Sequence, residues 1–216
     1  MTPLHVVTHV TPLHVDEACI VVVKPAGLPA VPGRGEHLQD CMAARVQAQF
    51  ADALVVHRLD MATSGLMLFA RGPQAQRALS RAFAQREVQK RYVAVVHGRI
   101  EPADGEIDLP LRADWPNRPR QRVDMAHGKP SLTRYCRVAH DPATNTSRVM
   151  LEPVTGRTHQ LRVHLLAIGH PILGDALYAP AAVPALAGRL LLHAESLRFP
   201  HPLSGAMLHL GCDVPF

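Results

Sequence analysis

Val56-His57-Arg58-Leu59-Asp60-Met61-Ala62-Thr63-Ser64-Gly65-Leu66-Met67-Leu68 sets one carboxylate beside a guanidinium, just before a turn of small and hydroxyl residues. Apolar runs flank this turn at 54–56 and 66–70. Such runs predict buried strands, which would hold the loop between them rigidly. Asp60 is therefore a candidate functional residue. The alternative is an ordinary turn aspartate that bonds its own backbone.

The composition fits a globular chain with a basic surface. Its 216 residues suit one large domain or two fused halves, and 47% hydrophobic residues can bury a substantial core. Lys and Arg number 23 against 18 Asp and Glu, a net charge of +5. This balance suits a polyanionic partner. With only 4% aromatic residues, base stacking on many aromatic platforms is not expected.

The four cysteines indicate reduced thiols rather than a metal ribbon. Cys19, Cys41, Cys136 and Cys212 form no C-x-x-C pair. Residues 1–15 lack the cationic and apolar regions of a secretory signal, and no run reaches membrane-spanning length. We therefore expect a cytoplasmic protein with no membrane association.

Hydrophobic periodicity predicts a mixed α+β domain. Residues 1–15 read as a short irregular leader, and 16–216 as one domain. A charged, proline-rich excursion covers 101–129. Helices are expected at 38–50, 73–86 and 158–168, and strands at 19–23, 92–96, 133–138, 148–154, 190–199 and 207–212. Alternation of strands with so few helices favours one mixed sheet.

The segment around Asp60 resembles the motif H-R-L-D-x-x-T-S-G-L of the RluA-type pseudouridine synthases. The resemblance implies an enzyme that isomerises uridine in RNA to pseudouridine without a cofactor or metal, with Asp60 as its essential nucleophile. It also implies a mostly antiparallel mixed sheet, in two halves around a central cleft and flanked by helices. The family's optional N-terminal S4-like domain has no counterpart in the segment before residue 16.

A second motif, Gly156-Arg157-Thr158-His159-Gln160-Leu161-Arg162-Val163-His164, resembles the family's G-R-T-H-Q-I-R-V-H. The resemblance implies that Arg157 pairs with Asp60, and a cation there would keep the carboxylate ionised. The start of a helix is an unfavourable place for an arginine, which indicates a functional reason. The alternative is a surface arginine. His159 and His164 are five residues apart, poor spacing for joint metal ligation, so packing is expected.

Further family motifs supply the expected substrate contacts. Tyr92, in Lys90-Arg91-Tyr92-Val93-Ala94, is implied to lie against the target base and to remove the C5 proton. Lys90 would steady the phosphate backbone or simply face water. Arg58, with His57 beside it, would take the place of the flipped base in the RNA stack, since a guanidinium both stacks and donates hydrogen bonds. Leu192, in the run 189–194, would wall the uracil pocket.

The excursion bears on which RNA is bound. Its segment Asp114-Trp115-Pro116-Asn117-Arg118-Pro119 resembles the dual-specificity branch of the family, which modifies stem-loops of 23S rRNA and tRNA. Arg112, Arg118 and Arg120 are expected to contact phosphates, and the alternative is a solvated loop. A single RNA target, a non-catalytic RNA-binding module and an unrelated hydrolase are the alternatives. We expect a monomer.

Overall fold

The computed structural model describes residues 10–35, 38–180, 183 and 187–216. In these ranges a ten-stranded sheet has the order β1-β2-β4-β11-β5-β10-β9-β6, with β3 paired to β4 and β12 to β11. Within the same ranges every strand pair is antiparallel except β4 with β11. The main-sheet strands are β1 (Pro12–Val15), β2 (Cys19–Lys24), β3 (Ala53–Val55), β4 (Ser64–Arg71), β5 (Gln89–His97), β6 (Asp104–Asp108), β9 (Leu132–Asp141), β10 (Thr146–Pro153), β11 (Leu192–Pro200) and β12 (Met207–Gly211).

The N-terminal half of the sheet is covered on both faces. Alternate residues of β2 and β4, such as Val21 and Leu68, pack against α2 (Gly72–Ala84). Their neighbours, such as Val22 and Phe69, pack against α1 (Met42–Gln49) on the other face. Burial on both faces explains why β4 reads as a continuous apolar run rather than an alternating one.

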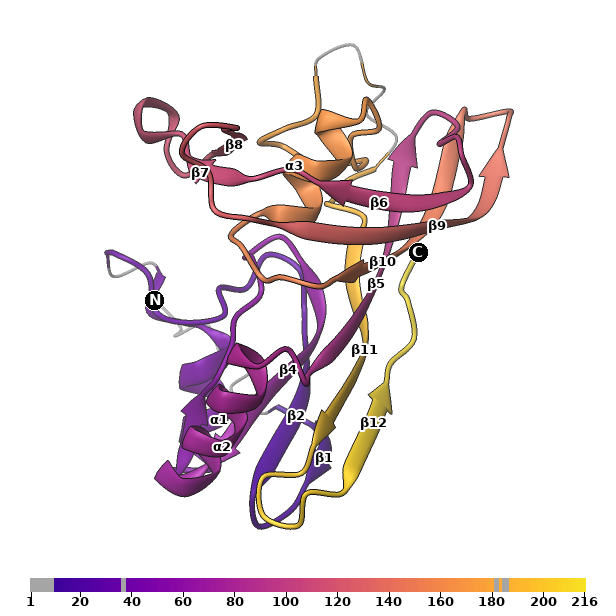
Figure 1. Ribbon diagram of the computed structural model, residues 1–216. Helices are drawn as coiled ribbons and strands as arrows, with labels where there is room; N and C mark the ends of the chain where they lie inside the picture. The colour runs from indigo at the N-terminus through magenta and orange to yellow at the C-terminus, as the bar shows by residue number, and fades with distance from the viewer. Residues whose placement is uncertain (1–9, 36–37, 181–182, 184–186) are drawn as a thin grey trace, which may run out of the picture.

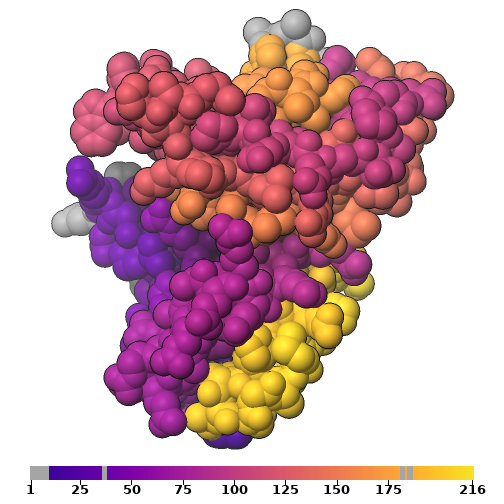
Figure 2. Space-filling view, in the orientation of Figure 1, coloured from indigo at the N-terminus to yellow at the C-terminus, as the bar shows by residue number. Residues whose placement is uncertain are grey.

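The C-terminal half carries its own core. Strands β5, β10 and β11 pack against α3 (Gln160–Ala167) through buried residues such as Leu151, Leu165 and Leu192. The excursion forms β6, the hairpin of β7 (Leu111–Ala113) and β8 (Gln121–Val123), and a 3-10 turn at Trp115–Asn117. In Figure 1 the β7–β8 hairpin and α3 lie above α1 and α2, and β5 and β11 run between the two halves. Figure 2 shows the surface hollowed between the halves.

Most expected elements are present, with shifted ends. The helices expected from 38 and from 158 begin at Met42 and Gln160 instead. Cys41 caps the first, with its Sγ accepting from the Ala44 N–H. The second ends before Gly169, whose φ of +85° is a common helix stop.

The irregular leader is a wrong prediction for its last four residues. Pro12–Val15 form β1, an edge strand paired with β2. Tertiary pairing overrides a segment with weak local preference. Residues 1–9 lie outside the described part of the chain. No helix among the described residues is long and apolar enough to cross a membrane.

Candidate active site

Asp60 lies in the loop between β3 and β4, which is pinned to the turn after β2. The Met61 carbonyl, next to Asp60, accepts hydrogen bonds from the Gly27 N–H at 2.8 Å and from Lys24 Nζ at 3.0 Å. The Thr63 N–H donates to the Asp60 carbonyl at 3.1 Å. The Asp60 side chain stays 24% exposed, so the backbone is fixed while the carboxylate faces the cavity.

Lys24 is a site residue that the sequence analysis missed. It is fully buried, and its ammonium also donates to the carbonyls of Pro25 and Leu28. Burial lowers the pKa of Lys24 to about 8, while the negative charge of Asp60 opposes this shift. The position of Lys24 just before a Pro-Ala-Gly turn could have marked it as a candidate. The carbonyls that it binds, however, lie in two loops that only the fold brings together.

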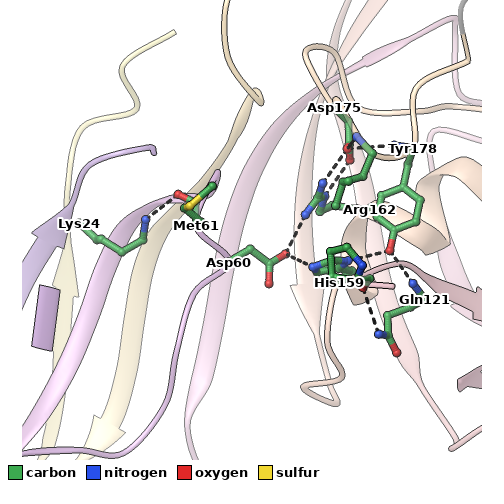
Figure 3. Close-up of polar contacts among 10 residues, drawn as sticks. Lys24, Asp60, Met61, Gln121, His159, Arg162, Asp175 and Tyr178 are labelled. Carbon is green, nitrogen blue, oxygen red and sulfur yellow. Dashed lines mark hydrogen bonds and ion pairs between the residues drawn. The ribbon is translucent and has the colours of Figure 1, made fainter. Parts of the chain in front are cut away.

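Arg162 is the cation that contacts Asp60. Its Nη1 donates to Asp60 Oδ2 at 3.2 Å, and its Nε and Nη2 donate to Asp175 at 2.8 and 2.7 Å (Figure 3). Asp175 is buried and also accepts from the backbone of Tyr178. Burial opposes the charge of Arg162, but the two carboxylates outweigh it and raise its pKa. The guanidinium is thus permanently charged and held in one orientation.

The predicted pairing of Arg157 with Asp60 is wrong. Arg157 is exposed, and its Nε donates to the Pro130 carbonyl at 3.2 Å. It precedes α3, and its backbone N–H is held by Gln160 Oε1 at 3.0 Å. Arg162, in the first turn of the helix, is aimed at Asp60 by Asp175. Both arginines belong to the motif, but Asp175, which holds Arg162 towards Asp60, lies in another loop.

One cavity of about 350 Å³ brings Asp60 together with most of the other predicted residues. Its lining includes His57, Arg58, Lys90, Tyr92, Arg157 and Leu192. Tyr92 and Leu192 come from the neighbouring strands β5 and β11. Burial, and next the charge of Asp60, raise the pKa of Tyr92, so its hydroxyl is protonated at neutral pH.

His57 is held as a neutral ring. Its Nε2 accepts from the Leu68 N–H at 2.9 Å, and the ring stacks on Phe83 with centroids 4.9 Å apart. Burial, followed by the positive charge of Lys90, lowers the pKa of His57 to about 3. The ring therefore anchors the loop to β4 and carries no charge for phosphate. Arg58 is exposed at the rim. Burial also lowers the pKa of Lys90.

The excursion arginines lie outside the lining of this cavity. All three are exposed on or near the β7–β8 hairpin. Arg118 lies over the Trp115 ring at 3.9 Å, Arg112 lies 3.6 Å from Asp124, and Arg120 lies 5.9 Å from the Tyr178 ring centre. They form an exposed basic surface near the site and do not contact Asp60.

The two histidines of the second motif have different surroundings. His164 bonds Thr133 Oγ1 at 2.9 Å and the Leu109 carbonyl at 3.0 Å, which fits the expected packing role. His159 instead faces the site, with Nε2 3.8 Å from Asp60 Oδ2 and Nδ1 2.7 Å from the Tyr178 hydroxyl. His159, Tyr178 and Asp175 were therefore missed as site residues. Asp175 ends the run His170-Pro171-Ile172-Leu173-Gly174-Asp175, well beyond the second motif in the sequence.

In the described part of the chain, side-chain atoms that could bind a metal gather at one place. His14, Asp16 and Cys19 lie at the β1–β2 turn, outside the cavity. Asp16 already accepts from His14 at 2.7 Å and from the backbone of Ala18 and Cys19 at 2.8 Å. The carboxylate is satisfied by donors of the chain itself, so nothing in this cluster calls for a metal.

The comparisons with known proteins identify the family. Residues 18–167 match the model of the RNA pseudouridylate synthase family. The chain belongs to this family. The synthase is 53% identical to the dual-specificity RNA pseudouridine synthase RluA of Escherichia coli K12, over 94% of this chain and 93% of that protein. The Pasteurella multocida protein of the same name is 48% identical, with the same coverage.

Solved structures agree with this assignment. Human RNA Pseudouridylate Synthase Domain Containing 1 superimposes with a TM-score of 0.81 at 28% identity, over 97% of the synthase and 85% of that chain. Human RNA Pseudouridylate Synthase Domain Containing 4 superimposes with a TM-score of 0.74 at 25% identity, over 94% and 88%. The expected fold and enzyme class are confirmed: the synthase isomerises uridine in RNA to pseudouridine.

Proposed function

We propose that Asp60 is the nucleophile of the synthase and that Arg162 holds its carboxylate in one orientation. The observation that supports this is the 3.2 Å contact from a guanidinium that Asp175 clamps through two hydrogen bonds. A fixed guanidinium that contacts one carboxylate oxygen orients the group that has to attack. The partner of Asp60 is thus reassigned from Arg157 to Arg162.

The target uridine has to leave its stack to reach this cavity, because Asp60 cannot reach a base inside a helix. We propose that the uracil lies between Tyr92 and Leu192, and that Arg58 at the rim fills the gap left in the RNA stack. The N1–C1′ bond breaks with help from Asp60, the uracil turns, and C5 bonds to C1′. The C5 proton then passes to the Tyr92 oxygen as the proton of that hydroxyl leaves to solvent, and N1 takes up a proton from water.

For the substrate, we propose stem-loops of 23S rRNA and the anticodon stem-loop of tRNA. Support comes from the dual-specificity name that the bacterial relatives carry and from the exposed arginines on the excursion. Arg112, Arg118 and Arg120 would contact phosphates outside the cavity, and Lys90 a phosphate nearer the flipped nucleotide. The neutral ring of His57 would hold the loop beside that nucleotide. We propose that the synthase acts as a monomer in the cytoplasm.

Tritium release from RNA labelled at uridine C5 tests these proposals, because bond formation at C5 expels the label. An rRNA stem-loop and a tRNA anticodon stem-loop are each incubated with wild type and Asp60→Asn. We expect release from both RNAs, lost in Asp60→Asn, with RNA affinity kept within about threefold. Release from one RNA only would remove the dual specificity. Turnover by Asp60→Asn would refute its role as nucleophile.

A further inference from the structure

A chain of polar contacts runs from the excursion to Asp60, and its first two links are hydrogen bonds. The backbone N–H of Gln121, the first residue of β8, donates to the Tyr178 hydroxyl at 2.7 Å. The same hydroxyl lies 2.7 Å from His159 Nδ1. On the other side of the ring, His159 Nε2 faces Asp60 Oδ2 at 3.8 Å (Figure 3).

The surroundings of His159 select one tautomer. A proton on Nδ1 would leave the lone pair of Nε2 facing the Asp60 carboxylate, which is repulsive. With the proton on Nε2, the imidazole presents a donor to Asp60 while Nδ1 accepts from the Tyr178 hydroxyl. Burial lowers the pKa of His159, although Asp60 opposes the shift, so the neutral ring with this tautomer is the main form at neutral pH.

The backbone of His159 also needs support. Its φ of 54° and ψ of 19° lie in the left-handed region, which suits Gly, Asn and Asp far better than a bulky side chain. A conformation of this kind persists only where the surroundings fix it. The hydrogen bond to Tyr178 and the edge-to-face contact of the two rings, with centroids 5.6 Å apart, supply that support.

Tyr178 also contacts the other donor to Asp60. Its ring lies 5.0 Å from the Arg162 guanidinium carbon, and its backbone N–H donates to Asp175, the clamp of that arginine. Only 8% of Tyr178 is exposed. A single buried tyrosine therefore borders both groups that face the Asp60 oxygen.

We propose that Tyr178 is a positioning residue that, through its hydroxyl, holds His159 as a second donor to Asp60 and links this pair to the β7–β8 hairpin. Seating of RNA on the hairpin then steadies the carboxylate through Gln121, Tyr178 and His159. The inference rests on the proposed role of Asp60 as nucleophile. It assigns Tyr178 an effect on turnover rather than on RNA binding.

Tyr178→Phe tests this most directly, because it removes one oxygen and keeps the ring beside Arg162. We expect kcat for tritium release to fall about three- to tenfold while KM stays within about twofold, as for loss of a hydrogen bond that acts in the transition state. Tyr135→Phe is the matched control. It removes a hydroxyl on β9 outside the cavity, and should leave both constants unchanged.

A double-mutant cycle shows whether Tyr178 affects kcat through His159 or through a general loss of order in the site. His159→Asn keeps a residue that tolerates the left-handed region but no longer reaches Asp60. If Tyr178 acts through His159, Tyr178→Phe added to His159→Asn lowers kcat no further. Additive losses would overturn the inference, as would an unchanged kcat or a loss confined to KM in Tyr178→Phe.

Asp60→Asn is measured in the same assay. An inactive Asp60→Asn beside a fully active Tyr178→Phe refutes only the link through Tyr178. An active Asp60→Asn refutes the role of Asp60 itself. Circular dichroism checks that each variant is folded. If Tyr178→Phe does not fold, the kcat values of His159→Asn and His159→Gln are compared instead. Gln places an amide donor near the position of Nε2, so it should retain more kcat than Asn, and the reverse order would overturn the inference.

Discussion

Arg162 and Arg157 lie five residues apart in one motif, yet the structure gives them opposite surroundings. Arg162 is buried between two carboxylates, whereas Arg157 is exposed and bonds a single backbone carbonyl. Removing a partner from a buried ion pair leaves an uncompensated charge, while losing a surface contact costs little. Their substitutions should therefore differ sharply.

We expect Arg162→Lys to lower kcat by about 10- to 100-fold, since lysine cannot donate to Asp175 in a bidentate manner and reach Asp60 together. Arg162→Ala should also destabilise the fold by about 3 to 5 kcal/mol by isolating Asp175. Arg157→Lys is the matched control and should keep kcat within about threefold. Tritium release and urea denaturation measure both effects, and equal losses in the two lysine variants would contradict the reassignment.

His57 predicts a pH dependence of stability. Its folded pKa of about 3 lies below the ordinary value of 6.5, so between these values the unfolded chain binds a proton that the folded chain does not. Stability is therefore full above pH 6.5 and falls as the pH drops toward 3. One such group costs about 1.4 kcal/mol per pH unit, or about 2 kcal/mol from pH 6.5 to pH 5.

His57→Gln removes this titration and keeps an oxygen that can accept from the Leu68 N–H. Denaturant unfolding at pH 7 and pH 5 compares the two proteins. The fall in unfolding free energy should be about 2 kcal/mol smaller in the variant. An identical fall in both would show that His57 is not held neutral.

Strands β4 and β11 meet where the Asp60 loop enters the sheet, and this contact depends on one glycine. Gly65 pairs with Ala194, and a Cβ on Gly65 would lie 2.3 Å from the Ala194 carbonyl oxygen. Its φ of +116° is also unfavourable for any other residue. The first constraint comes from the close approach of the two strands, which joins the halves of the sheet beside the site.

Gly65→Ala should therefore destabilise the fold by about 2 to 4 kcal/mol and reduce activity by displacing the loop. Gly188→Ala is the control, because a Cβ there meets nothing within 4 Å. It should change stability by less than about 0.5 kcal/mol. Urea denaturation followed by circular dichroism measures both, and a neutral Gly65→Ala would contradict the close strand contact.

The elements were predictable to the extent that local signals define them. Helix α2 showed an apolar stripe and a proline at its start, and it lies where expected. Helix α3 begins later than expected because the left-handed His159 precedes it. Strand β1 lacked a clear pattern, since only half of an edge strand packs and its partner β2 supplies the order.

At the scale of the whole molecule, the net charge of +5 and the exposed excursion arginines favour docking on RNA by electrostatics. Phosphate contacts release counterions, so affinity should fall with salt by a slope of about 0.7 to 0.9 per contact. We expect Arg118→Ala and Arg120→Ala each to weaken binding and to reduce that slope by about one contact.

Arg77→Ala gives the control for this measurement. Arg77 is exposed on α2 and absent from the cavity lining, so its loss changes net charge by the same amount without removing a proposed contact. Fluorescence anisotropy with a labelled stem-loop, over a salt series, yields each slope. Equal slopes in all three variants, or affinity independent of salt, would contradict docking through the excursion.

The sequence by itself determined the family, the candidate nucleophile and most strands and helices, because these depend on contiguous motifs and local periodicity. Only the tertiary structure decided which arginine contacts Asp60, that Lys24 holds its loop, and that Asp175 and Tyr178 hold Arg162 and His159 beside it. Asp175 lies 13 residues beyond Arg162, and Lys24 lies 37 before the carbonyl it holds. Such partners are chosen by side-chain direction and burial, which the packing of distant segments sets.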